Sequence, residues 1–159
     1  MTADFTLEEL KAIAAAPMLA GLTVSMIDLG LISTIPEIAA LSKEMAGAAK
    51  KYPHNSIIQA VFSEAAIKEG SVKLEQPDIK AEDVESGALI EQAIEAITVA
   101  LDVLKDRVPV EEVNEYKGFI YTCAEAVAQA AGSGIFGTGI KVSAKESAAL
   151  ERLKAVLAV

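Results

Sequence analysis

The chain of 159 residues is poor in the side chains that build most metal and redox centres: it has one cysteine, Cys123, one histidine, His54, and no tryptophan. A single cysteine excludes a disulfide within the chain. One histidine excludes a ferritin-like di-iron site, which needs two Glu-x-x-His pairs, and too few Cys and His remain for a structural zinc cluster. This composition leaves only cation sites built from oxygen ligands, of the calcium or magnesium type.

Aromatic residues are also scarce, at 4% of the chain, whereas hydrophobic residues make up 52%. The core is therefore expected to be aliphatic. Small side chains let helices approach closely, and alanine is the best helix former. No segment alternates polar and apolar residues for long enough to form a sheet. The sequence predicts an all-α fold, and its length favours a single all-helical domain over residues 1–159.

Basic residues are outnumbered, 14 against 23 acidic ones, which gives a net charge of −9. Such a surface repels phosphate backbones, so we expect no nucleic-acid partner, and a metal ion or a basic protein is the favoured type of partner. The first residues contain Asp4 and Glu8 but no basic cluster. No secretory signal is therefore predicted, and together with the lone cysteine this favours the cytoplasm.

Long hydrophobic runs are missing as well. The uncharged run from Ala12 to Ile27 has sixteen residues, fewer than the ~20 that cross a bilayer. It also contains Pro17 and Gly21. We expect a buried central helix here and no membrane span. The mean hydropathy of +0.37 leaves room for an apolar homodimer interface.

An internal repeat is the clearest positive signal. DLGLISTIPEIAAL (28–41) matches GTGIKVSAKESAAL (137–150). Each copy reads as the end of an uncharged helix, a Gly-containing turn, a hydroxyl N-cap (Thr34 or Ser143) and a new helix. A glutamate, Glu37 or Glu146, completes a capping box in each copy. The repeat predicts a pseudo-twofold pair of helical hairpins.

Apolar residues at spacings of three and four predict helices over most of the chain. A capping box at Thr6 opens the first helix, which Pro17 kinks or splits. The expected helices span about 7–30, 35–52, 56–69, 81–108, 110–131 and 144–157. The third is expected to bury Ile58, Val61, Phe62 and Ala65. The result is a bundle of six to seven helices.

Asp28 is the best candidate for a ligand-binding residue, because it is the only charge between Ala12 and Pro36. It lies at a helix end beside a turn, and Glu37 follows one turn and a cap later. Two carboxylates in such a place could hold a divalent cation. The alternatives are structural: Glu37 pairs with Thr34 in a capping box, and Asp28 caps a neighbouring helix.

Two other patterns are less specific. Glycines between 132 and 137 fit GxGxxG, but a helix rather than a strand precedes them, so we expect a connector and no nucleotide cofactor. Cys123 and His54 could in principle form a thiolate–base pair. Cys123, however, lies on the apolar stripe of a predicted helix, where cysteine behaves as a small hydrophobe. We therefore expect no enzymatic activity.

The repeat region, at 12–44 and 113–157, resembles the TerB-like (tellurite resistance B) helical family. The resemblance rests on the helix–turn–cap–helix pattern that occurs twice. The segment YKGFIYTCAEAVAQAAGSGIFGTGIKVSAKESAALERL also resembles the C-terminal part of a related family of small uncharacterised bacterial helical proteins. The resemblance implies an all-helical, pseudo-twofold fold, a link to stress or metal-ion response and no established enzymatic activity. The family's turn acid falls on Asp28 and its cap-region glutamates on Glu37 and Glu146. The first turn here reads Asp-Leu-Gly instead of Asp-Gly, and Gly137 replaces the acid in the second copy.

Two functions follow as hypotheses. The first is a non-enzymatic cytoplasmic protein, related to stress or tellurite resistance, with a weak divalent-cation site at Asp28 and Glu37. The second is a homo-oligomeric interaction module with an acidic docking face for a basic protein. That face would use the acidic residues that surround the predicted linker: Glu75, Asp78, Glu82, Asp83 and Glu85. A helix start stabilises acidic groups, so a simply solvated face is the alternative for this cluster.

Overall fold

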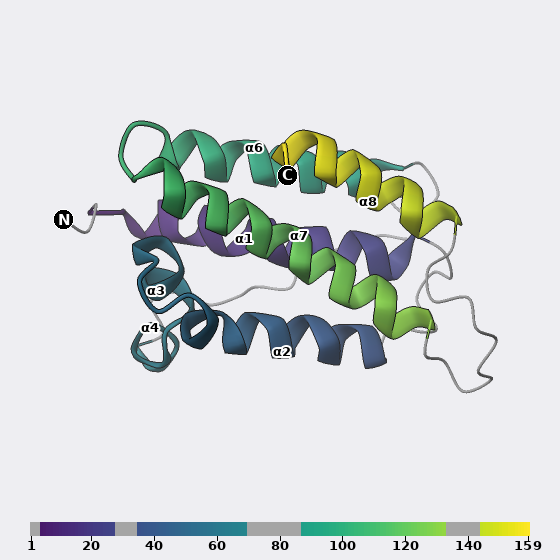
Figure 1. Cartoon of the computed structure of the whole chain (residues 1–159), viewed down its shortest axis with the longest axis horizontal. Coiled ribbons are helices and arrows are strands. Elements are labelled where there is room, and N and C mark those ends of the chain that lie inside the picture. The colour runs from purple at the N-terminus through teal and green to yellow at the C-terminus, as the bar shows by residue number, and fades with distance from the viewer. Residues whose placement is uncertain (1–3, 28–34, 70–86, 133–143) are drawn as a thin grey trace.

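The computed structural model of the chain describes residues 4–27, 35–69, 87–132 and 144–159, and within them it is all-α. The described helices are α1 (Leu7–Met26), α2 (Ile35–Lys51), α3 (Ser56–Phe62), α4 (Glu64–Lys68), α6 (Ala88–Leu104), α7 (Val110–Gly132) and α8 (Ala144–Leu157). Figure 1 shows the longer helices running side by side as a bundle. The predicted all-α bundle is confirmed.

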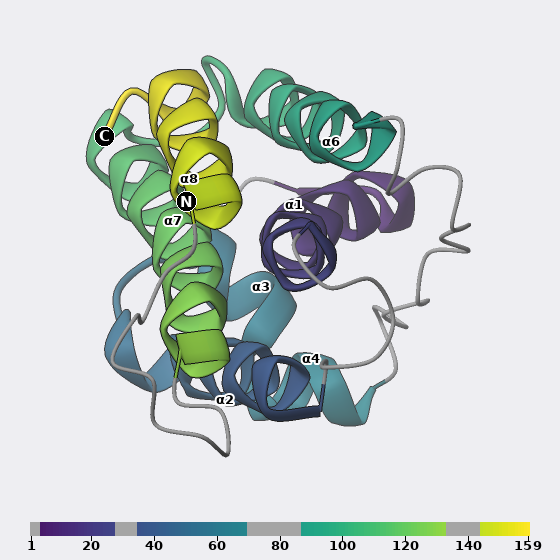
Figure 2. The same ribbon diagram turned by 90° about the vertical axis from the view of Figure 1, so that its right-hand side faces the viewer.

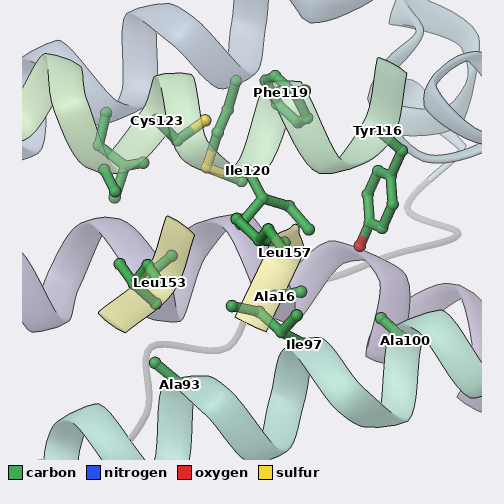
Figure 3. Close-up of a cluster of buried hydrophobic side chains, with 14 of the residues drawn as sticks. Ala16, Ala93, Ile97, Ala100, Tyr116, Phe119, Ile120, Cys123, Leu153 and Leu157 are labelled. Atoms are coloured by element: carbon green, nitrogen blue, oxygen red, sulfur yellow. The ribbon is translucent and has the colours of Figure 1, made fainter. Parts of the chain in front are cut away.

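Helix α1 lies at the centre of the bundle. It packs chiefly against α7 and α6 and also touches α2, α3 and α8, and Figure 2 shows the other helices arranged around it. The sequence explains this position, because α1 is apolar on nearly every side and such a helix is stable only when it is covered. Aliphatic side chains from its neighbours, among them Ile97, Ile120 and Leu157, fill the core beside it (Figure 3).

Helix α1 begins at the predicted capping box. The Thr6 hydroxyl accepts a hydrogen bond from the Glu9 N–H at 3.3 Å, and the Glu9 carboxylate accepts one from the Thr6 N–H at 2.8 Å. The helix then runs unbroken through Pro17. Splitting at this residue was one of two expected outcomes and does not occur.

A hydroxyl from another helix explains how α1 tolerates its proline. Proline has no N–H, so the carbonyl of Ile13, four residues earlier, loses its helical partner. The Tyr116 hydroxyl on α7 donates a hydrogen bond to that carbonyl at 2.5 Å. Both side chains are fully buried, and Figure 3 shows the Tyr116 hydroxyl pointing at the α1 backbone. The bond satisfies a carbonyl that would otherwise be orphaned in the core.

The single helix expected over 56–69 is wrong, because Ser63 divides it into α3 and α4. Ser63 is extended (φ −68°, ψ 155°), and its hydroxyl accepts a hydrogen bond from the Ala66 N–H at 3.2 Å. A serine that caps a following helix competes with the continuation of the preceding one. The new start rotates the apolar face, so Ala66 is buried and Ala65, which was expected in the core, is exposed.

The helix expected over 81–108 is shorter at both ends. Helix α6 begins at Ala88, after Gly87 with φ +73°, and it ends at Leu104, four residues before the expected end. Asp106 then adopts φ +59°, a left-handed conformation that aspartate tolerates better than most residues and that a helix cannot include. Helices α7 and α8 begin as predicted, at Val110 and Ala144.

The two copies of the repeat share one described feature. Helix α2 begins at Ile35 and α8 at Ala144, each directly after the predicted hydroxyl cap. The turns themselves, 28–34 and 133–143, lie outside the described residues. The pseudo-twofold relation between the hairpins stays a prediction.

Candidate functional site

The predicted cation ligands fall largely outside the described part of the chain. Asp28 is not described, and Glu37 lies in the first turn of α2 with a side chain that is not described. Among the described residues, no group of three or more His, Cys, Asp or Glu side chains could hold a metal ion. The GxGxxG segment beyond Gly132 and the acidic cluster at 75–85 are likewise not described. These hypotheses stay predictions.

Cys123 lies where the sequence predicts it, in the core. Its side chain has no exposed surface, and burial, followed by the nearby Glu44 charge, raises the pKa of the thiol well above its ordinary value. A thiol in this state is a poor nucleophile. His54 lies in an exposed turn before α3. One residue is therefore inside the bundle and the other on its surface.

A groove of about 360 Å³ runs between α1 and α6 on the surface. Alanines and two larger aliphatic residues form its floor, and a glutamate and a glutamine stand on its α6 side. The lining residues are Ala12, Ala15, Leu19, Gln92, Glu95, Ala96 and Val99. On each helix these positions repeat at spacings of three, four and seven, so the groove follows two helical turns, roughly 10 Å of length.

The floor of this groove is the side of α1 that the described helices leave uncovered. Between Lys11 and Ser25, the residues of α1 that are not fully buried are Ala12, Ala15, Met18 and Leu19, all of them apolar. A helix face that meets water is ordinarily polar. Val99 on the α6 side is 46% exposed. The strip is small and apolar, and polar residues border it, so it offers an apolar face that another molecule can cover.

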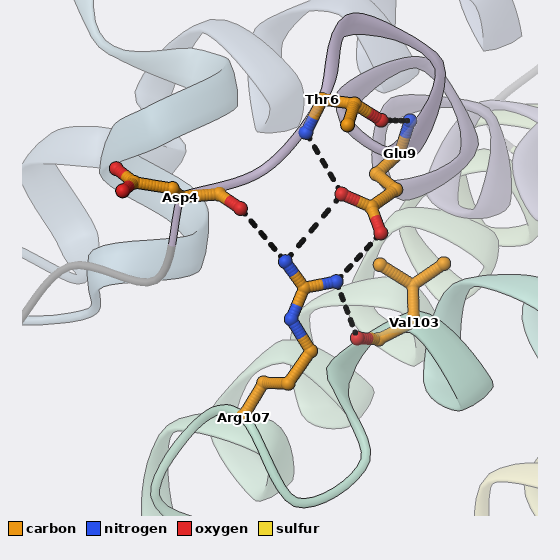
Figure 4. Close-up of polar contacts among 5 residues, drawn as sticks. All are labelled: Asp4, Thr6, Glu9, Val103 and Arg107. Carbon is orange, nitrogen blue, oxygen red and sulfur yellow. Dashed lines mark hydrogen bonds and ion pairs between the residues drawn. The ribbon is translucent and has the colours of Figure 1, made fainter.

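Hydrogen bonds hold α1 and α6 together at both ends of the pair. The Thr23 hydroxyl, near the end of α1, donates to the carbonyl of Leu89, in the first turn of α6, at 3.1 Å. At the opposite end, Arg107, just after α6, reaches the start of α1 (Figure 4). The two helices are therefore antiparallel, and their spacing is fixed without a partner. Binding to a preformed groove costs less conformational entropy than binding to one that must first become ordered.

The Arg107 cluster is the densest polar site described. Its guanidinium donates to the Glu9 carboxylate at 2.6 Å and to the Asp4 carbonyl at 2.7 Å, and it stacks 4.7 Å from the centre of the Phe5 ring. The hydrogen bond from Arg107, with a smaller contribution from the Thr6 N–H, lowers the pKa of Glu9. The guanidinium and the Glu9 carboxylate bond each other and the backbone beside them, so the cluster joins the start of α1 to the end of α6.

A second hollow, of about 340 Å³, lies at the turn between α6 and α7. Its floor is aliphatic, and its rim carries charges of both signs: Asp102, Lys105, Asp106 and Lys117. Because these charges balance, the hollow favours neither an anion nor a cation. The α1–α6 groove differs in this respect, because its lining has one charged residue, Glu95.

Sequence reasoning missed the groove and the contacts that fix it. Arg107 and Glu9 are 98 residues apart and Thr23 and Leu89 are 66 apart, so no local pattern joins them. One signal was available in the sequence. The run Ala12 to Ile27 is apolar on nearly every side, which indicates a helix that has to be covered all round.

The length and apolar character of α1 match those of a membrane-spanning helix. Within the described residues, α1 is the one helix long and apolar enough to cross a membrane, and 56% of that apolar stretch is buried inside the bundle. The core helix of a bundle meets the same criterion.

No protein-family model, curated protein or solved structure matches the chain.

Proposed function

We propose that the protein is a non-enzymatic interaction module that binds an amphipathic helix of a partner protein in the groove between α1 and α6. The uncovered apolar side of α1 carries this proposal. A helix that lays residues i, i+3 or i+4 and i+7 into a groove needs a floor with the same spacing, and Ala12, Ala15 and Leu19 have it. Alanines in the floor allow the close axial approach of packed helices.

The size of the groove predicts a weak, transient complex. Two turns of a partner helix would bury about three aliphatic side chains, worth roughly 5–9 kcal/mol before the cost of association. Association costs at least about 4 kcal/mol, so about 5 kcal/mol or less remains, and the expected dissociation constant is roughly 0.2 mM or weaker. Nuclear magnetic resonance titration suits this range, because it detects weak binding and locates it.

The test uses an uncharged probe, a helical peptide of about 18 residues with leucines on one face and glutamines on the other, so five turns are available. Titrated into isotope-labelled protein, it should give saturable shifts at the backbone amides of the groove residues. Ala96→Leu fills the groove and should weaken binding at least about tenfold, roughly 1.4 kcal/mol. The matched control is Ala46→Leu, on the exposed side of α2, which should leave binding unchanged.

Three results would contradict the proposal. The probe could give no saturable shifts, or shifts spread beyond α1 and α6, or equal binding by the two leucine variants. A fourth result would contradict it by identifying a second copy of the chain as the occupant of the groove. If the groove amides shift with protein concentration alone while the sedimentation coefficient rises, the groove is a homodimer interface and not a site for a partner's helix. The net charge of −9 on each copy opposes that outcome.

The earlier hypotheses enter this proposal only in part. A cytoplasmic location and the TerB-like resemblance, with its implied link to stress response, stay predictions. So does the cation site at Asp28 and Glu37. A basic partner protein, expected from the charge of the chain, agrees with the surroundings of the groove.

A further inference from the structure

Negative charge borders the groove on its α6 side. Helix α6 has three acidic residues and no basic one. Glu91 is paired with Arg152 of α8. The side chains of Glu95 and Asp102, however, make no ion pair or hydrogen bond with any residue that the structure describes. Of the two, Glu95 lines the groove itself.

No positive charge balances Glu95 from the other wall. The α1 residues that line the groove are uncharged, and the last charged residue of α1, Lys11, pairs with Glu8 at 3.1 Å. A helix that enters the groove would also remove part of the water around the Glu95 carboxylate. That loss weakens binding unless the incoming helix brings a cation, whose attraction grows as water leaves.

We propose, on the basis of the function proposed above, that the groove selects a basic amphipathic helix and that Glu95 is its specificity-determining residue. The partner places an arginine or lysine against this carboxylate, next to the apolar ridge that occupies the groove. Arginine is the better fit, because its planar guanidinium can bond both carboxylate oxygens. Gln92 lies one turn from Glu95 and also lines the groove. Its amide can accept or donate, so it does not discriminate by charge.

The experiment compares three peptides that differ at one position on the flank of the leucine face: arginine, glutamine or glutamate. Each is titrated into the wild-type protein, Glu95→Gln and Glu95→Lys. The control is Glu64→Gln, on the exposed surface of α4, which removes the same charge from the net total. We expect all variants to retain the helices that form the groove, and far-UV circular dichroism checks this.

The expected result is a preference of the wild type for the arginine peptide over the glutamate peptide. Exposed ion pairs contribute modestly, so we expect a preference of about 3- to 10-fold at low salt, falling towards unity at roughly 0.3 M salt. Glu95→Gln should lose most of the preference, and Glu95→Lys should reverse it. Glu64→Gln should behave like the wild type.

Two results would overturn the inference and leave the proposed function intact. In the first, all three peptides bind the wild type equally while Ala96→Leu still blocks binding. In the second, Glu95→Gln and Glu64→Gln reduce the preference by the same amount, so that the net charge of the chain and not Glu95 selects the peptide. If no peptide binds, including the uncharged probe, the proposed function itself fails.

Discussion

Replacing Tyr116 with phenylalanine tests whether its hydroxyl supplies the hydrogen bond that Pro17 denies to the Ile13 carbonyl. The variant keeps the buried ring and removes one oxygen, so the main effect is an orphaned carbonyl in the core. Such a group costs about 1–3 kcal/mol. For a chain of this size, 1 kcal/mol lowers Tm by about 2–4 °C, so we expect a fall of about 2–12 °C. Urea unfolding measures the free energy and thermal unfolding measures Tm, both followed by far-UV circular dichroism.

A second substitution isolates the cause. In Pro17→Ala the new N–H can donate to the Ile13 carbonyl within α1, so the carbonyl no longer depends on Tyr116. Tyr116→Phe should then cost at least about 1 kcal/mol less in this background than in the wild type. Independent sites add to within about 0.5 kcal/mol. Equal costs in the two backgrounds would therefore refute the argument, as would a Tyr116→Phe protein with wild-type stability.

The remaining predictions concern ionisable groups. Burial raises the pKa of both Cys123 and Tyr116, so the folded chain keeps protons that the unfolded chain releases above about pH 8.5 and 10; stability should therefore fall as the pH rises through this range, and an unchanged urea midpoint would contradict this. Alkylation of Cys123 at neutral pH should be slow and should accelerate only as urea unfolds the protein, whereas rapid labelling of the native chain would show an accessible thiol. The pKa of Glu9 is lowered, so its ionised carboxylate contributes stability above about pH 4.5, and this stability is lost as the pH falls through the lower pKa of the folded protein. Arg107→Gln should make stability depend less steeply on pH in this acid range. An unchanged dependence would show that Arg107 is not the cause. Calorimetry with calcium, magnesium, manganese and zinc should give heat that Asp28→Asn removes if the predicted cation site exists, and an absence of heat would eliminate that hypothesis.

Local patterns predicted the helices that local chemistry determines. The capping box at Thr6, the start of α7 after Pro109 and the burial of Cys123 all follow from residues within a few positions. The errors also have local causes that were underestimated. The helix expected over 56–69 includes Ser63, although its hydroxyl can open a new helix, and the helix expected over 81–108 includes Asp106, although it can adopt the left-handed conformation.

The candidate site could not be predicted in the same way, because it depends on how helices distant in the sequence meet. The apolar character of α1 was visible, but which side would be left uncovered depends on where α6, α7 and α2 pack. The position of α6 is fixed by contacts such as Thr23 with Leu89, which no spacing rule connects. Tyr116 is a further case. Its pairing with the carbonyl that Pro17 frees is evident only once α1 and α7 are seen to touch.

The central place of α1 has a consequence for how the protein is made. This helix leaves the ribosome before the helices that cover most of it, α6 and α7. At bacterial or eukaryotic speeds of synthesis, about 5–20 residues per second, the roughly one hundred residues that follow take about 5–20 s to appear. During that interval the apolar helix α1 is not yet covered by the helices that bury it in the folded protein. Cells would have to shield it with a chaperone, and a strain that lacks such factors should accumulate the newly made chain in aggregates.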